Sequence, residues 1–336
     1  MKGFIAAFVA IVAVGLASPA RSAEPVKLVA KYNMPEDVKG RSDHLGVDVS
    51  GQRLFVTAET AHQVLVFDLG TGRFIRAITG IDIPHAILYR NDLDRIYITD
   101  GGAGELKIYD GKTYKLLGAA TLKVDADSIG YDPATHYLYI DNGGGDAHET
   151  FSMLSVVDTT SGEKVTDIKI DGDTLEAMAL ESSTPKLYVN NPAKNQVDVV
   201  NRDTHALTAS WPVTMGKRNV AMAPDEASHR LFVACRSGAL VVFDTETGKE
   251  LQSLPIAKGV DDLIFDPARK RLYAFCSSGE LDVYQQKDPD HYSSLGQIQT
   301  APGAKNAVFV ESLHRLFTTV PPQGGAPGQV YVYEIE

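Results

Sequence analysis

The sequence predicts an all-β protein, a seven-bladed β-propeller built from four-stranded antiparallel blades. Three observations predict this fold: a strand motif recurs seven times, its copies lie 41 to 49 residues apart, and the first copy holds four strand-forming runs. A period of about 40 to 50 residues with four strands per unit is typical of propeller blades.

The first complete copy, residues 44–81, shows the strand pattern most clearly. Its four β-branched and aromatic runs are residues 45–49, 53–58, 64–67 and 74–78. Clusters rich in Gly, Ser and Thr separate these runs, as in β-hairpins. Apolar residues do not recur at three- and four-residue spacing, so the pattern favours a meander of strands over helices.

The second run of each copy carries an aromatic residue that anchors the repeat. The seven anchors are Phe55, Tyr97, Tyr139, Tyr188, Phe232, Tyr273 and Phe317. The last copy has only three runs, residues 306–310, 315–319 and 330–334, whereas a strand-like segment, residues 26–32, precedes the first copy. Because unpaired sheet edges promote aggregation, we expect residues 26–32 to supply the fourth strand of the last blade.

The N-terminus has the pattern of a secretory signal peptide over residues 1–20, with cleavage after residue 20 or 23. Lys2 provides the positive end, residues 4–17 are apolar, and small residues surround Ala20. The apolar run is shorter than the ~20 residues that a membrane span needs. We therefore expect a periplasmic or secreted protein without a membrane span, in which residues 26–336 form a single propeller domain.

The net charge limits the kinds of partner that this protein can have, and the cysteine content limits its disulfides. The formal charge of −11 argues against a nucleic-acid partner, which would require a basic surface. We expect a monomer. Export would permit a disulfide between Cys235 and Cys276. These cysteines occupy equivalent places on neighbouring blades, which should separate them by more than the ~7 Å that a bridge allows, so buried free thiols are favoured.

Two segments carry a resemblance to a known family. Residues 186–191 (KLYVNN) and 244–248 (DTETG) resemble the repeats of the YVTN-repeat, YncE-like family of exported seven-bladed propellers. The resemblance extends over the whole mature chain and implies the fold, but this fold hosts many activities. The Asn of the repeat is replaced by Glu59 or Thr60 in the first blade and by Cys235-Arg236 in the fifth.

Positions at the start of each innermost strand are expected to surround the mouth of the central channel. Counting about 11 residues back from each anchor, with a correction for small insertions, gives His44, His85, Ser128, Ala177, Asn219, Asp262 and Asn306. The residues just before them are Asp43, Pro84, Asp127, Glu176, Arg218, Asp261 and Lys305. These positions vary while the strands around them repeat, which predicts a specific ligand-binding mouth.

The charges of these residues suggest two kinds of chemistry. Like charges ~6 Å apart repel by roughly 3 kcal/mol at an effective dielectric constant of ~20, so a proton or a cation would relieve the crowded carboxylates. His44, His85 and Asp127 would offer nitrogen and oxygen ligands to a divalent metal ion. Alternatively, both histidines simply donate to backbone carbonyls, or they contact a ligand directly without a metal. A carboxyl group with a raised pKa would equally serve as a general acid or base.

Other motifs narrow the function without assigning catalytic residues. The glycine-rich segment 141–149 lies in a loop on the same face, where it forms either a lid or an ordinary long turn. The chain has no Gly-x-Ser-x-Gly nucleophile motif, no Cys-x-x-Cys and no dinucleotide fingerprint. Its single tryptophan, Trp211, disfavours a quinone-cofactor propeller, since the families of that kind carry repeated tryptophan signatures.

The sequence favours a protein that binds a small-molecule or extended ligand at the channel mouth. The alternative is a metal-assisted hydrolase or lyase of the lactonase type, which would use the mouth histidines and carboxylates. A protein-interaction scaffold is a third class, and the polar loops of the mouth count against it. The identity of the ligand stays open.

Overall fold

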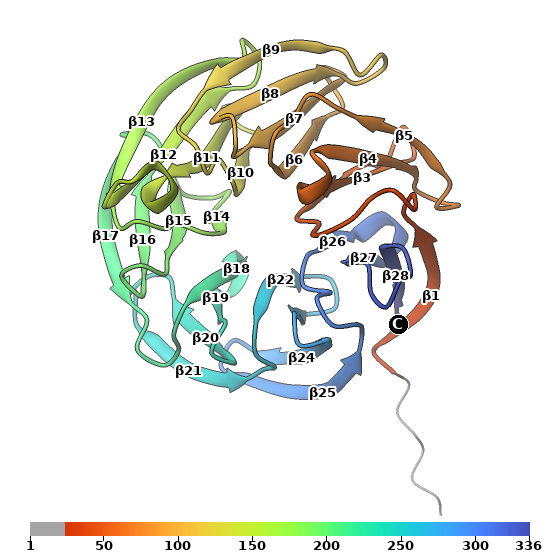
Figure 1. Ribbon diagram of the computed structural model, residues 1–336. Coiled ribbons are helices and arrows are strands. Elements are labelled where there is room, and N and C mark those ends of the chain that lie inside the picture. The colour runs from red at the N-terminus through yellow and green to blue at the C-terminus, as the bar shows by residue number, and fades with distance from the viewer. Residues whose placement is uncertain (1–23) are drawn as a thin grey trace, which may run out of the picture.

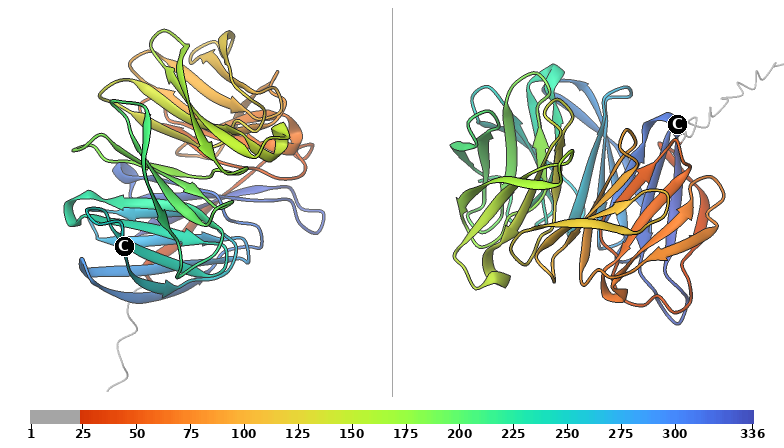
Figure 2. Two further views of the ribbon diagram at one scale, coloured as in Figure 1. Left: turned by 90° about the vertical axis from the view of Figure 1, so that its left-hand side faces the viewer. Right: turned by 90° about the horizontal axis from the view of Figure 1, so that it is seen from above.

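The computed structural model describes residues 24–336, which form seven four-stranded antiparallel sheets around a central channel (Figure 1). This confirms the predicted seven-bladed β-propeller. Two further views show the twisted blades standing side by side around the ring (Figure 2). The predicted signal peptide, residues 1–20, lies outside the described residues. No helix within residues 24–336 is long and apolar enough to cross a membrane.

In the first six blades the strands run in chain order from the channel outward (Figure 1). The first three blades are β2 (Leu45–Asp48), β3 (Arg53–Ala58), β4 (Gln63–Asp68), β5 (Phe74–Ile78); β6 (Pro84–Arg90), β7 (Arg95–Asp100), β8 (Glu105–Asp110), β9 (Leu116–Thr121); and β10 (Ile129–Asp132), β11 (Tyr137–Gly143), β12 (Phe151–Asp158), β13 (Glu163–Asp171). The four runs expected in the first blade agree with β2 to β5 to within one residue at each end.

The other blades repeat this plan. They are β14 (Met178–Leu180), β15 (Lys186–Asn191), β16 (Gln196–Asn201), β17 (Ala206–Pro212); β18 (Asn219–Asp225), β19 (Arg230–Cys235), β20 (Ala239–Asp244), β21 (Glu250–Pro255); β22 (Val260–Asp266), β23 (Arg271–Cys276), β24 (Glu280–Asp288), β25 (His291–Gln299); and β26 (Ala307–Val310), β27 (Arg315–Val320), β28 (Gln329–Ile335). Short 3-10 helices are η1 (Glu59–Ala61), η2 (Gly144–Ala147), η3 (Glu226–Ser228) and η4 (Glu311–Leu313).

The N-terminal strand closes the ring, as expected. Strand β1 (Val26–Asn33) pairs antiparallel with β28, so the last sheet has the order β1-β28-β27-β26 (Figure 1). The hydroxyl of Tyr32 also donates to the carbonyl of Leu69 in the first blade at 3.0 Å. The two ends of the described chain therefore hold each other in place, and β28 has no free edge.

The hydrophobic core lies between blades. All seven anchor aromatics are fully buried, and each shares an apolar cluster with residues of a neighbouring blade. Phe55 of the first blade, for example, shares one apolar cluster with Ile87 and Ile96 of the second. Cys235 and Cys276 are buried free thiols within these layers, which agrees with the expectation from their spacing.

The outer hairpins use a repeated local motif. Asp68 at the end of β4 accepts hydrogen bonds from the backbone nitrogen and hydroxyl of Thr71, at 2.8 and 2.7 Å. Asp244 and Thr247 make the same two bonds in the fifth blade. Such Asp-x-x-Thr turns satisfy donors that the ladder leaves open, and they place each outermost strand against the third.

Candidate functional site

Strand pairing fixes which residue of each blade faces the channel mouth. In every blade one innermost-strand residue pairs with the residue after the anchor aromatic. These seven residues, the inner ring, are Leu45, Ile87, Ile129, Met178, Met222, Leu263 and Ala307. The residues just before them, the middle ring, are His44, Ala86, Ser128, Ala177, Ala221, Asp262 and Asn306. One residue earlier lies the mouth ring, Asp43, His85, Asp127, Glu176, Val220, Asp261 and Lys305.

This register corrects the positions expected from the sequence in two blades. In the second blade the mouth-ring residue is His85 and not Pro84, and in the fifth it is Val220 and not Arg218. The middle ring lies 11 residues before the anchor in all seven blades, because the first hairpin always has the same length. The correction for insertions introduced the error.

Arg218 and Asn219 accordingly lie away from the mouth cavity. Arg218 is exposed with a positive φ of 58° and lines an adjoining hollow, which shares Glu176, Val220 and Arg236 with the mouth cavity. Asn219 is fully buried. Its side-chain nitrogen donates to the Asn190 side chain at 2.7 Å, so it serves the packing of the fourth and fifth blades.

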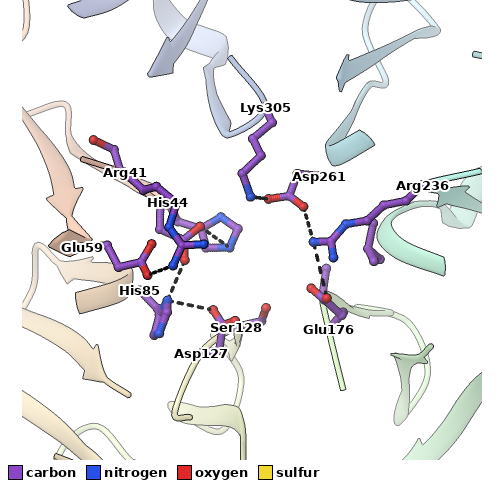
Figure 3. A pocket seen from close by; sticks show the side chains of 14 residues that line it. Arg41, His44, Glu59, His85, Asp127, Ser128, Glu176, Arg236, Asp261 and Lys305 are labelled. Carbon is purple, nitrogen blue, oxygen red and sulfur yellow. Dashed lines mark hydrogen bonds and ion pairs between the residues drawn. The ribbon is translucent and has the colours of Figure 1, made fainter. Parts of the chain in front are cut away.

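A cavity of about 160 Å³ lies at the channel mouth, and all seven mouth-ring residues line it (Figure 3). His44, Ser128 and Ala177 of the middle ring also reach it. The other lining residues lie outside the strands. They are Arg41, Ser42, Glu59 and Arg236. Five acidic and five basic side chains therefore face one small space.

One side of the cavity is a cluster of two histidines and two aspartates. Asp43 Oδ2 lies 2.7 Å from His85 Nδ1, and Asp43 Oδ1 lies 3.8 Å from His44 Nε2. His85 Nδ1 also lies 3.8 Å from Asp127 Oδ1, too far for a hydrogen bond. Asp127 Oδ1 is buried and has no hydrogen-bond partner within residues 24–336.

The pKa values in this cluster diverge because of burial and the neighbouring charges. Burial opposes protonation of His85, but Asp43 and Asp127 outweigh burial and raise the pKa of His85 to about 9. The pKa of His44 is raised as well, since Asp43 and Asp262 outweigh its burial. Burial would raise the pKa of Asp43, yet His44 and His85 lower it to about 2. Burial raises the pKa of Asp127 to about 6.

The opposite side of the cavity is a chain of ion pairs (Figure 3). Arg236 Nη2 and Lys305 Nζ donate to the two oxygens of Asp261, and Arg236 Nη2 lies 3.5 Å from Glu176 Oε1. Burial raises the pKa of Glu176 to about 8, although Arg236 opposes the shift. Asn306 links both sides, because its side-chain nitrogen donates to Asp43 at 3.1 Å and to Asp261 at 3.2 Å.

Three side chains are close enough together to hold a metal ion. They are Asp43, His44 and Asp127, each of which offers a ligand atom within 4.8 Å of the others. Nitrogen and carboxylate oxygen ligands suit zinc, manganese and related divalent ions. The set expected from the sequence contained His85 in place of Asp43. In the structure, Asp43 binds His85 Nδ1 and also lies next to His44.

His44 and His85 differ from most other histidines of the chain. Six of the nine occupy turn positions with positive φ, a conformation that histidine tolerates better than most residues. These six are His62, His136, His148, His205, His229 and His314. His44 and His85 are instead placed by the channel strands, with side chains 26% and 13% exposed. The alternative expected both side chains to donate only to backbone carbonyls. In the structure their ring nitrogens face the carboxylates of Asp43 and Asp262 instead.

Three charged loop residues of the cavity, Arg41, Glu59 and Arg236, were not among the expected site residues. Arg41 pairs with Glu59, and Arg236 pairs with Asp261. Glu59 and Arg236 each lie four residues after an anchor aromatic, in loops that leave a second strand. That shared offset is the signal that would have found them, whereas Arg41 has no counterpart in the repeat.

The glycine-rich segment contributes to a groove that adjoins the cavity. This groove, of about 530 Å³, shares Arg41, Glu59 and His85 with the mouth cavity. Gly145, Asp146 and His148 of the segment line its outer part. The segment itself forms η2 and an ordinary hydrogen-bonded turn, in which His148 N donates to the Gly145 carbonyl at 2.9 Å.

Comparison with known proteins gives distant relatives of the same kind. No family model matches the chain. A protein named "Uncharacterized protein YncE" from Salmonella typhi is 28% identical over 97 residues, which are 29% of this chain and 27% of that protein. The protein of the same name from Salmonella typhimurium (strain LT2) is 27% identical over the same shares. The similarity thus spans about a quarter of each relative's length.

A solved structure shares the fold over nearly the whole chain. It is a chain of the crystal structure of a mitotic checkpoint complex, with a TM-score of 0.75 and 13% sequence identity. The alignment covers 97% of this chain and 99% of that one. At this identity the likeness establishes the architecture alone.

Proposed function

We propose that this YncE-like seven-bladed β-propeller binds a small anionic ligand in its mouth cavity. The observation that carries the proposal is the pairing of Arg236 and Lys305, from different blades, on the single carboxylate of Asp261. Two cations that share one anion keep a positive charge and spare donors. These donors border the same space as the histidine cluster (Figure 3).

The unused donors of the pair support recognition of an oxyanion. Within residues 24–336 the side-chain contacts of Arg236 all go through Nη2, so Nε and Nη1 are left to donate. Lys305 uses one of its three donors, on Asp261. The Nε–H and Nη1–H groups of Arg236 and the Lys305 ammonium can each donate a charge-assisted hydrogen bond to an oxygen of a carboxylate or phosphate.

The charge balance of the cavity supports the same ligand class. The five acidic and five basic lining side chains would cancel if all were charged. With a pKa of about 8, Glu176 is protonated at neutral pH, and the raised pKa values of His44 and His85 keep both histidines charged. Basic charges therefore exceed acidic ones, and an anion restores the balance.

Calorimetric titration of the purified protein with acetate, succinate, phosphate and sulfate tests this proposal. We expect binding of at least one of these anions, and a loss of about tenfold or more in affinity in Arg236→Gln and Lys305→Met, since hydrogen bonds to charged groups contribute about 1.5–3 kcal/mol. Arg218→Gln is the matched control, because Arg218 does not line the cavity. Equal affinity in all three variants, or no binding of any anion, would refute the proposal.

Metal-assisted hydrolysis is the second candidate function, and the trio Asp43, His44 and Asp127 favours it. A divalent ion there would polarise a carbonyl or activate water, the chemistry of lactone and ester hydrolysis. The unpartnered Asp127 Oδ1 would gain a partner. Elemental analysis of protein purified without chelators or an affinity tag tests this candidate. One equivalent of metal would support it if His44→Ala loses both the metal and the hydrolysis of lactones or esters. Metal-free protein would contradict this candidate and leave only the proposed anion binding.

We also propose that the protein acts outside the cytoplasm as a monomer. The support is the pattern of residues 1–20, with Lys2 ahead of an apolar run. Cell fractionation with N-terminal sequencing of the exported form tests the location. A mature protein that starts after residue 20 or 23 is expected, and an unprocessed cytoplasmic chain would contradict it.

A further inference from the structure

A second chamber of about 230 Å³ lies in the channel beyond the mouth cavity. Five inner-ring side chains supply its apolar wall: Leu45, Ile87, Ile129, Met178 and Met222. They come from the first five blades in order, so the wall is continuous around more than half of the channel. On each innermost strand, the apolar inner-ring residue lies two positions after the mouth-ring residue.

The two chambers share a wall. His44, Ser128 and Ala177 of the middle ring line both of them. In the second to fifth blades the middle ring consists only of small residues, Ala86, Ser128, Ala177 and Ala221, whose side chains project little into the channel. His44 spans the step, since its Nε2 faces Asp43 of the mouth and its Nδ1 faces Asp262 of the chamber, both at 3.8 Å.

The chamber wall combines apolar side chains with the polar groups of His44, Ser128 and Asp262. Ile129 and Met178 keep part of their surface open although they lie on innermost strands, whereas Leu45, Ile87 and Met222 are almost completely buried. Methionine is unbranched and flexible, so Met178 and Met222 can adjust to different apolar shapes. An apolar group that enters this space removes exposed hydrocarbon from water on both sides.

We propose that the ligand of the mouth cavity is an amphipathic acid, whose anionic head binds beside Arg236 and Lys305 and whose apolar group passes the middle ring into this chamber. The inference rests on the proposed anion-binding function and names its ligand class. An engineered apolar cavity of about 150 Å³ accommodates benzene, so a chamber of about 230 Å³ holds an aromatic ring or an alkyl chain of about six carbons.

Titration of the full chain with acetate, butyrate, hexanoate and octanoate tests this inference. All four carry the same head, so only the apolar part changes. We expect affinity to rise about fourfold for each methylene group that enters the chamber, the factor that corresponds to about 0.8 kcal/mol. The rise should continue from hexanoate to octanoate and stop only for longer acids, once the chamber is full.

Variants of the chamber locate the effect. Met178→Trp fills the chamber and should abolish the dependence on chain length while acetate still binds. Met178→Gln, of similar volume, should weaken hexanoate binding about tenfold and keeps the test valid if the larger residue prevents folding. Met215→Gln is the matched control, because Met215 is a methionine on the surface, 45% exposed; it should bind every acid as the unaltered protein does.

The outcomes separate the two proposals. Acetate binding with no dependence on chain length would refute the amphipathic ligand and leave anion binding intact. A chain-length effect that persists in both Met178 variants would place the apolar group elsewhere and also overturn the inference. If no acid of the series binds at all, the anion-binding function fails and this inference fails with it.

Discussion

His85 and Asp43 occupy the same register position on neighbouring blades, and His85 Nδ1 lies 2.7 Å from Asp43 Oδ2. One ion pair thus joins the first and second blades at the channel mouth. Asp43 also accepts from Asn306 of the seventh blade at 3.1 Å. The carboxylate of Asp43, in the first blade, therefore links this blade to the second blade through His85 and to the seventh blade through Asn306.

Asp43 and Asp127 should respond in opposite ways to the same substitution. Asp43→Asn breaks a mostly buried ion pair, so we expect a loss of about 3 kcal/mol in the free energy of unfolding at pH 7. Asp127→Asn removes a carboxylate whose pKa is raised by burial, so it should increase stability in metal-free protein. Chemical denaturation of both variants in the presence of a chelator measures the difference. A loss of stability in both would contradict the assigned charges.

Stability should fall as the pH rises from about 6 to 9. His85, with its pKa raised to about 9, contributes stability that is complete below the ordinary histidine pKa and is lost as the pH rises toward 9. Glu176 acts in the same direction. Its carboxyl group ionises near its ordinary pKa in the unfolded chain but only near pH 8 in the folded protein, so the folded state loses stability as the pH rises between these values. We expect the melting temperature to drop by several degrees over this range.

The variant Glu176→Gln isolates one of these contributions. It should flatten the pH dependence between about 5 and 8 without changing the part due to His85. A melting temperature that rises with pH over this range in the unaltered protein would disprove the protonation states proposed for the mouth.

Closure of the ring can be tested with two glycines of similar conformation. Gly72 and Gly80 have φ values of 71° and 84°, so alanine is strained at both. A Cβ on Gly72 would lie 1.9 Å from the Tyr32 ring of β1, whereas one on Gly80 would meet no atom within 4 Å. Gly72→Ala should therefore destabilise by at least about 1 kcal/mol more than Gly80→Ala.

Removal of the closing strand is the stronger form of this test. Deletion of residues 26–32 exposes β28 and should cause aggregation, measured by light scattering and thermal melting. An unchanged melting curve for the deletion, or equal losses for the two glycine variants, would show that β1 contributes little to the ring.

The two cysteines should be inert until the protein unfolds. Burial raises the pKa of Cys235 and of Cys276 to about 12, so neither carries a thiolate at neutral pH. A thiol reagent should label neither residue in the native protein and both in guanidinium chloride. Rapid labelling of native protein, or no labelling after unfolding without a reductant, would contradict two buried free thiols.

The sequence by itself determined the architecture. Seven copies of an anchored strand motif predict seven blades, and the missing strand of the last copy predicts closure by residues 26–32, because hydrogen bonding within a sheet is local and repeats with the chain. The same reasoning found Asp43, His44, His85, Asp127, Glu176, Asp261 and Lys305, all of which line one cavity. Each of them lies at a fixed distance from an anchor aromatic.

Only the tertiary structure decided which groups meet. Arg236 enters the cavity from the loop that leaves β19, and the register of β18 excludes Arg218 from it. The offset of Arg236 from its anchor aromatic marks the position, but only the folded ring shows that this side chain meets Asp261. The pairing of Asp43 with His85, rather than of both histidines with Asp127, depends on side-chain distances across blade boundaries. Asp43 and His85 are 42 positions apart and lie on different blades, so the geometry of their contact follows from closure of the whole ring.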